Sequence, residues 1–249
     1  MAGYALLRHH RSDYGEWEAF EREPHAALAP YVRRMTGWVE RTAFTRRREV
    51  PHAGAVLIIN FENRLNVSTP GRPEQFDSYH SFFAGLASSY VITESAGFGG
   101  GVQLDFTPMG AYLFTGIPAH ELANQVVHLG DILGSGADGL VERLEDTPDW
   151  DARLDMVEQM ALDRLAVAPR PSEGVAWAFQ RLEARRGLVR INDLCSALDW
   201  KPKQLIERFR HEVGLPPKQV ARIIRFQRAV QMLTPERPSC LAEIGRAHV

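Results

Sequence analysis

The sequence predicts an α+β fold with a β-rich N-terminal sensor-like domain, which ends in trailing helices, and an all-α C-terminal domain. Short apolar runs separated by turn residues fill the first third of the chain, which is typical of strands. After residue 172, apolar residues recur every three or four positions, as helices require. Residues 166–172 hold two prolines among small residues, which indicates a linker. We therefore predict domains at residues 1–165 and 173–249, joined by a linker at residues 166–172.

The β-rich part is predicted from a few short runs. Residues 55–59 (AVLII) form a continuous apolar run that predicts a buried strand. Residues 89–95 and 102–106 alternate at least partly and predict two further strands, with the glycines at 97 and 99–101 forming a turn between them. Residues 4–8 and 42–50 are weaker strand candidates. Residues 28–39 predict a helix that begins near Pro30.

Helical periodicity dominates the rest of the chain. Residues 119–125, 137–145 and 149–165 predict helices that close the first domain. Four amphipathic helices then predict a compact module, in which Phe209 and Phe226 are expected to be buried together. Their apolar stripes are Val175, Ala178, Phe179 and Leu182; Ile191, Leu194, Cys195 and Leu198; Leu205, Phe209 and Val213; and Ile223, Phe226, Val230 and Leu233.

The composition is that of a globular protein, because 45% of the 249 residues are hydrophobic and 24% are charged. No apolar run is long enough to span a membrane, and the first residues do not form a secretory signal. The two cysteines, Cys195 and Cys240, are far apart and lack CxxC spacing. We therefore expect a cytoplasmic protein without a disulfide scaffold or a structural zinc site.

The net charge of −2 hides an asymmetry along the chain. Residues 181–233 hold 12 lysines and arginines against 5 acidic residues, whereas residues 1–180 hold 15 against 24. A basic block of this kind is typical of a protein that binds a polyanion. A solvated basic surface gives the same count, so the charge alone leaves both interpretations open.

The segment 190–214 predicts a helix-turn-helix. A short helix at residues 191–197 runs into a turn at residues 198–200, and a second helix opens at Lys201 and Pro202. The second helix of such a pair fits a DNA major groove. Its predicted outer face carries side chains that bond base edges and phosphates. These candidate DNA-binding residues are Lys201, Lys203, Gln204, Glu207, Arg208 and Arg210. Short helix pairs also occur as mere packing units.

Residues 190–233 (RINDLCSALDWKPKQLIERFRHEVGLPPKQVARIIRFQRAVQML) closely resemble the first half of the AraC/XylS DNA-binding domain, and the resemblance covers about residues 175–242. It includes Phe209 and a G-x-x-P-K-x-x-x-R-x-x-R-F series, which runs from Gly214 to Phe226. The resemblance implies a sequence-specific transcription regulator that binds double-stranded DNA. It implies two helix-turn-helix units joined by a long helix at residues 217–233, and it adds Lys218 and Arg222 to the candidate DNA-binding residues.

Three residues depart from the pattern of this family. Asp199 stands in the turn where the family often has glycine, and aspartate tolerates a left-handed backbone better than most residues. Lys201 stands where the family often has a serine cap, whose loss costs roughly 1 kcal/mol. Glu207 is unusual on a DNA-facing surface, where it would accept from a cytosine amino group or remain solvated.

The N-terminal domain is also similar to a known type, one that precedes such DNA-binding domains. Residues 21–38 (EREPHAALAPYVRRMTGW) and 107–134 (TPMGAYLFTGIPAHELANQVVHLGDILG) carry this likeness, which runs from about residue 20 to 165. It implies a module that binds an unknown small-molecule effector or forms a homodimer, without an enzymatic activity or a cofactor. Seven aromatics are candidates for an effector pocket or for an ordinary core: Trp17, Phe20, Trp38, Phe82, Phe83, Tyr90 and Phe106.

An alternative from another class is a cupin-like metal-binding enzyme in the N-terminal domain. Its candidate ligands are His52, His80, His120, Glu121 and His128. None of them shows the HxH or HExxH spacing of common metal sites. We therefore expect no metal site and no catalytic residues in this domain.

The end of the chain departs most from the resemblance. Residues 238–242 look like the opening of a second helix-turn-helix, but the chain then reads Glu243 to Val249 and stops, so this second unit is incomplete. The codons GAG-ATC-GGA-AGA-GCA-CAC-GTC followed by TGA encode this tail and match a common sequencing adapter. We expect a truncated regulator whose native chain continues past Ala242.

Overall fold

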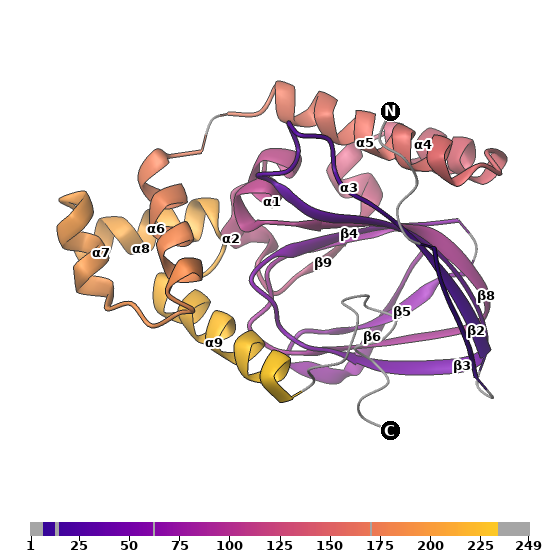
Figure 1. The fold of residues 1–249 in the computed structure, drawn as a ribbon, viewed down its shortest axis with the longest axis horizontal. Coiled ribbons are helices and arrows are strands. Elements are labelled where there is room, and N and C mark those ends of the chain that lie inside the picture. Colours follow the sequence, from indigo (N-terminus) through magenta and orange to yellow (C-terminus); the bar gives the residue numbers. More distant parts are fainter. Residues whose placement is uncertain (1–6, 13–14, 62, 170, 234–249) are drawn as a thin grey trace.

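The computed structural model describes residues 7–12, 15–61, 63–169 and 171–233, and it has an α+β architecture (Figure 1). In this part of the chain an antiparallel sheet of nine strands is followed by helices. The strands are β1 (Leu7–Ser12), β2 (Gly15–Arg22), β3 (Val32–Glu49), β4 (Ala55–Asn60), β5 (Leu65–Thr69), β6 (Arg72–Tyr79), β7 (Phe82–Ala84), β8 (Val91–Phe106) and β9 (Val126–His128).

The two longest strands, β3 and β8, form the centre of the sheet. The order is β1-β2-β3-β8-β4-β7-β9, and β5 pairs with the far half of β8 and with β6. The β3–β8 register shifts between Thr42 and Thr45, which bends both strands. Figure 1 shows the result: the sheet folds over, so that β5, β6 and the far half of β3 lie opposite β4 and β9. One face of the sheet therefore points inward.

The strand prediction for residues 55–59 is confirmed, because β4 spans Ala55–Asn60 and is buried along its whole length. The helix predicted at residues 28–39 is wrong, because Val32 begins strand β3. This segment pairs with β2 on one side and with β8 on the other, and two ladders of backbone hydrogen bonds outweigh a local helical preference.

The turn predicted at the glycines 97 and 99–101 is also wrong, since these residues lie inside β8. A Cβ at Gly101 would lie 2.4 Å from the Ile59 carbonyl oxygen, so only glycine allows this close approach between β8 and β4. Gly97 has φ +84°, which side chains rarely adopt. The glycines therefore let one long strand bend where a turn was expected.

Two other expected elements differ in their bounds. The strand expected at residues 4–8 is β1, which begins at Leu7, and residues 1–6 lie outside the described residues. The helix expected at residues 119–125 ends early, because α2 covers Ala119–Leu122 and the next apolar residues pair with β7 as β9. Helices α4 and α5 match the expectations for residues 137–145 and 149–165.

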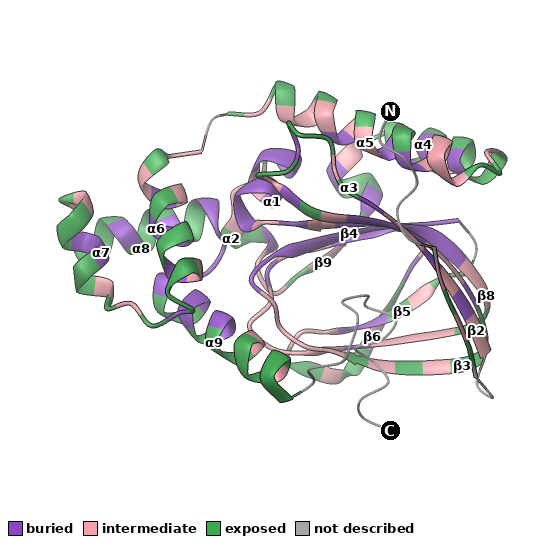
Figure 2. Cartoon of the chain, viewed as in Figure 1, coloured by how far each residue is buried: buried purple, intermediate pink, exposed green. Residues whose placement is uncertain are grey.

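Helices cover the outer face of one layer of the sheet, and the larger apolar core lies between them (Figure 2). These helices are α1 (Pro108–Thr115), α2 (Ala119–Leu122), α3 (Leu129–Leu133), α4 (Gly136–Asp146) and α5 (Trp150–Ala166). Leu104 and Phe106 of β8 and Leu57 of β4 are fully buried against Leu154 and Val157 of α5 and their neighbours. The face of each strand opposite to this core points into the folded sheet.

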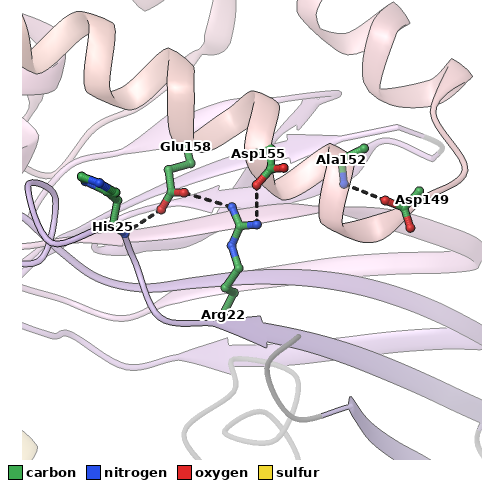
Figure 3. Close-up of polar contacts among 6 residues, drawn as sticks. All are labelled: Arg22, His25, Asp149, Ala152, Asp155 and Glu158. Carbon is green, nitrogen blue, oxygen red and sulfur yellow. Dashed lines mark hydrogen bonds and ion pairs between the residues drawn. The ribbon is translucent and has the colours of Figure 1, made fainter. Parts of the chain in front are cut away.

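A buried arginine fixes α5 on the sheet (Figure 3). The Arg22 side chain, at the end of β2, is only 5% exposed and donates to Asp155 at 2.5 Å and to Glu158 at 3.1 Å. Glu158 also accepts from the backbone N–H of His25 at 2.6 Å. Asp149 caps the start of α5 by accepting from the Ala152 N–H at 2.9 Å. The helix is therefore held at its N-terminus and along its sheet-facing side.

The remaining helices form a second apolar core, and they lie where the sequence predicts them. They are α6 (Glu173–Ala184), α7 (Ile191–Leu198), α8 (Pro202–Glu212) and α9 (Pro217–Leu233). Phe179 and Phe209 are at most 1% exposed and lie in this core. The expectation that Phe226 is buried with Phe209 is wrong, since Phe226 is 43% exposed. Its part of α9 extends past the helical core and runs beside the sheet (Figure 1).

The sheet and the helical module touch through a shared apolar contact. Ala53, Leu86 and Met109 of the N-terminal part belong to the core of the helical module. The backbone N–H of Ala53 donates to Gln227 Oε1 of α9 at 3.0 Å. An ion pair joins Arg33 of β3 to Glu183 of α6. Because the backbone of residue 53 bonds α9 directly, the end of β3 and the helix that follows α8 are physically connected.

Candidate nucleic-acid interface

A tight left-handed turn joins α7 to α8. Asp199 ends α7 with φ 52° and ψ 41°, the conformation expected for the turn. The Trp200 N–H donates to the Cys195 carbonyl at 2.9 Å, which closes the last turn of α7. Cys195 is buried in the helical core. The three residues from Asp199 to Lys201 therefore reverse the chain within one short connection.

The first turn of α8 is capped from inside the helix. Lys201 occupies the N-cap position, where its side chain makes no capping hydrogen bond. Instead Oε1 of Gln204 accepts from the Lys201 N–H at 2.9 Å, which is half of a capping box. Pro202 follows as the first helical residue, where no N–H is needed. Gln204 is exposed, but one of its two polar atoms is already engaged.

All six candidate residues of α8 are exposed and lie on the side opposite to the core. They are Lys201, Lys203, Gln204, Glu207, Arg208 and Arg210. Leu205 and Phe209, which follow the spacing of the predicted stripe, are fully buried. Helix α8 therefore presents a mostly polar face with four cationic side chains and one carboxylate, next to which Ile206 is 39% exposed.

Two contacts arrange the charges on this face. The Lys203 ammonium lies 3.8 Å from the Glu207 carboxylate, and these side chains are 86% and 62% exposed. The guanidinium carbon of Arg208 stands 4.5 Å from the ring centre of Trp200. A Cβ on Gly174 of α6 would lie 2.5 Å from the same tryptophan ring, so the ring packs over the start of α6. Trp200, which the sequence analysis placed only in the turn, therefore orients Arg208.

Of the two candidates on α9, Arg222 lies beside the sheet. Lys218 and Arg222 are both exposed. Arg222 lines a groove of about 470 Å³ between α9 and the sheet, together with Phe226, Arg48 and Tyr90. The Arg48 guanidinium stacks on the Tyr90 ring at 4.7 Å. The structure therefore places Arg222 beside the sheet, while the candidates of α8 form a surface of their own.

The C-terminal end of α8 rests on the N-terminal part of the molecule. His211 Nε2 lies 3.3 Å from the hydroxyl of Tyr112 on α1. Gly214 has φ +101°, and a Cβ there would lie 3.0 Å from the Ala119 carbonyl oxygen of α2. Glu212 is buried and accepts from the Ser172 N–H at 2.8 Å, and burial raises its pKa. The exposed face of α8 is thus held on a rigid base.

The residues proposed for a metal site do not come together. Within the described ranges, no group of three His, Cys, Asp or Glu side chains is placed to hold a metal ion. His52 lies at the inner face of the sheet, His128 packs on Tyr79, and His120 lies 6.3 Å from His211 between ring centres. Among the same residues, no helix is both long and apolar enough to cross a bilayer.

The folded sheet encloses a second candidate site, a cavity of about 150 Å³. Three of the seven aromatics proposed for a pocket line it, namely Trp17, Trp38 and Phe82. The other four lie elsewhere: Phe83 and Phe106 are in the apolar core, Phe20 stacks on Trp150 of α5, and Tyr90 lines the α9 groove.

One side of the cavity is charged. The Arg47 guanidinium pairs with Glu40, and their side chains are 14% and 7% exposed. Glu49, two residues further along β3, accepts weakly from the Thr93 hydroxyl at 3.4 Å. Burial raises the pKa of Glu49 to about 7, against the opposing effect of Arg47. Burial lowers the pKa of His52, which lines the same cavity. This cluster was not predicted, although Arg47 and Glu49 carry charges within the strand predicted at residues 42–50.

Comparison with known proteins gives distant likenesses. Residues 20–128 match a family described as a domain of unknown function (DUF6597). No curated protein sequence matches the chain. The similar solved structures include the AraC-like transcriptional activator CuxR, at 14% identity and a TM-score of 0.38, over 91% of this chain and 86% of that one. They also include ToxT from Vibrio cholerae, at 6% identity and a TM-score of 0.46, over 84% of this chain and 91% of that one. Similarity at this level does not assign a function.

Proposed function

We propose that this chain is a sequence-specific, DNA-binding transcription regulator in which α8 is the recognition helix. The observation that carries the proposal is the exposed face of α8, whose cationic and amide side chains stand opposite a fully buried apolar stripe. A helix about 10–12 Å across with such a face fits a major groove about 12 Å wide. The basic charge of residues 181–233 attracts the phosphates that flank the groove.

The contacts suggest a division of roles among the candidates. Lys203 is the donor and the more exposed side chain of its pair with Glu207, and it would reach base edges. Arg210, on the same face about two turns further along, would bind phosphate. Arg208 is held over Trp200 and would approach the backbone in a fixed direction. Lys218 and Arg222 would contribute phosphate contacts only if the α9 side also approaches DNA.

For the rest of the chain we propose residues 1–165 as a regulatory domain, 166–172 as a linker and 173–249 as the DNA-binding domain. The cavity in the folded sheet supports a small-molecule effector as the signal. A homodimer is the second role that we propose for the regulatory domain, because two copies of α8 would read two half-sites. Sedimentation of the intact chain with and without DNA tests the dimer.

The experiment that tests this function starts with genomic DNA fragments enriched by the intact chain. Binding to an enriched fragment and to random DNA is then compared for two variants. Lys203→Ala should weaken the specific complex by about 1–3 kcal/mol and relax base preference. Arg210→Ala should weaken both complexes alike and reduce the salt slope by about one unit.

The matched control is Arg143→Ala, which removes an exposed arginine from α4, a helix far from α8 (Figure 1). It should leave both affinities unchanged. If Lys203→Ala weakens specific and random DNA equally, Lys203 does not read bases. If the intact chain enriches no fragments and Arg210→Ala binds random DNA as tightly as the intact chain does, the DNA-binding proposal is wrong.

A further inference from the structure

The cavity in the sheet combines apolar walls with a single charged side. Its walls come from strands on both layers, and they include Val56 and Ile58 of β4, Val67 of β5 and Phe82 of β7. At about 150 Å³ it has the size of a cavity that holds one benzene-sized ring. The ligand that fits is therefore small, with an apolar body of one ring or a short branched chain.

The charges near the cavity leave one carboxylate without a full partner. Arg47 pairs with Glu40, and Arg34 pairs with Asp105 at 2.7 Å. Gln103 Nε2 donates to the other oxygen of Asp105 at 2.6 Å. These contacts satisfy the carboxylates of Glu40 and Asp105, and Glu18, which also lines the cavity, is half-buried.

The Glu49 carboxylate differs from those of Glu40 and Asp105. Its Oε1 receives only the long hydrogen bond from Thr93, and its Oε2 is buried without a hydrogen-bond partner among the described residues. A buried carboxylate oxygen without a donor costs free energy that a bound donor would recover. Glu49 is half-buried and lines the cavity.

We infer that this cavity binds a small apolar molecule bearing a protonated amine, whose ammonium group bonds the Glu49 carboxylate. The inference rests on the proposed regulatory role and names the chemical class of the effector. An anionic ligand would meet Glu49 beside Glu40 and Asp105, whose nearest cations are already paired. A neutral hydrocarbon would leave Glu49 Oε2 without a donor. An amine supplies the donor and the charge together.

The binding of an amine is coupled to a proton. Because burial raises the pKa of Glu49 to about 7, part of the free protein carries a proton there at neutral pH, and a cation must displace it. The groups that face Glu49 are Arg47, Thr93, Asp105 and Glu40, and burial lowers the pKa of the nearby His52. The affinity for an amine should therefore fall about tenfold for each pH unit below the pKa of Glu49 and level off above it.

The test measures binding of four probes that share one ring to the intact chain by calorimetry: 2-phenylethylamine, 2-phenylethanol, phenylacetate and ethylbenzene. At pH 8 the amine should bind at least tenfold more tightly than the others, and only its affinity should fall between pH 7 and pH 5. Glu49→Gln should remove both the preference and the pH dependence while the alcohol still binds. Glu74→Gln, which changes an exposed glutamate on β6, should alter neither.

Each other outcome overturns the inference. Tighter binding of the carboxylate, equal binding of all four probes, or no binding of the amine at millimolar concentration would each exclude an amine site. An amine affinity that survives Glu49→Gln would exclude Glu49 as its partner. These results do not depend on DNA, so a chain that binds DNA but not the amine keeps the proposed function and loses only this inference.

Discussion

The sheet and the helical module place their charges in opposite ways. In the sheet, Glu40 and Arg47 pair inside the fold with side chains at most 14% exposed. In the helical module, Lys203 and Glu207 pair on the outside at 86% and 62% exposure, while Leu205 and Phe209 fill the interior. The sheet, with a cavity and internal charges, is suited to bind a small molecule inside it. The helical module, with a filled core and charges on its outside, is suited to bind the surface of a large partner.

The contact between these parts shows how one could influence the other. Glu49 lies in the cavity, and four residues later the Ala53 N–H bonds Gln227 of α9. The segment between them, Val50 to His52, lines the cavity, and Val50 and Pro51 also line the α9 groove. A ligand that moves the end of β3 therefore acts on a segment that already touches the helical module.

The largest expected effect is on the stability of the helical module. Phe209→Ala removes a fully buried ring from the helical core, so it should lower the free energy of unfolding of the module by about 3–5 kcal/mol. Phe226→Ala, at 43% exposure on the same module, should cost about 1 kcal/mol. Urea unfolding monitored by circular dichroism measures both. Similar losses of unfolding free energy for the two variants would contradict a helical core packed around Phe209.

The helical module was largely predictable because helical periodicity is local. The stripe of Leu205, Phe209 and Val213 predicts both the buried side of α8 and, by exclusion, its exposed face. The sequence misplaced Phe226, because the burial of its part of α9 depends on where the helix lies against the sheet. That placement is set by contacts with residues far away in the sequence.

The sheet was less predictable because strand pairing is not local. Residues 28–39 have helical spacing, but residues 32–39 lie in β3, since β2 and β8 pair on either side of them. The glycines of β8 predict a turn when only the sequence is considered. In the fold, Gly101 lies close to the Ile59 carbonyl of β4, an approach that requires glycine within a strand. The cavity depends on the same pairing, because Glu49 and Thr93 meet only through the β3–β8 ladder. The run of four charged residues at positions 46–49 was the one available signal.

The stability of the sheet should depend on pH through Glu49. Its pKa in the folded chain is about 7, above the ordinary 4.5, so the folded state binds this proton more tightly than the unfolded state. The stability it contributes is complete below pH 4.5 and is lost as the pH rises through 7. Glu49→Gln carries no charge, so at pH 8 it should be more stable than the natural chain by up to about 3 kcal/mol.

Thermal or urea unfolding at pH 4 and pH 8 checks this expectation. The gap between Glu49→Gln and the natural chain should be near zero at pH 4 and open only at the higher pH. Glu74→Gln on the exposed side of the sheet should follow the natural chain at both values. A constant gap at all pH values would mean that the glutamine packs better and that the charge of Glu49 plays no part.

The smallest expected effect lies at the turn before α8. Asp199 has φ 52°, where a side chain costs roughly 1 kcal/mol and glycine costs almost nothing. Glycine also adds freedom to the unfolded chain, so Asp199→Gly should stabilise by only about 0.5 kcal/mol. Asp199→Ala keeps the side-chain penalty without the tolerance of aspartate, and it should destabilise by about 1 kcal/mol. Urea unfolding of both variants gives their order, and a more stable alanine variant would show that the turn is not left-handed. The left-handed turn fixes the orientation of α8 relative to α7. Because glycine adopts the same backbone conformation, the glycine variant should keep the DNA preference of the natural chain.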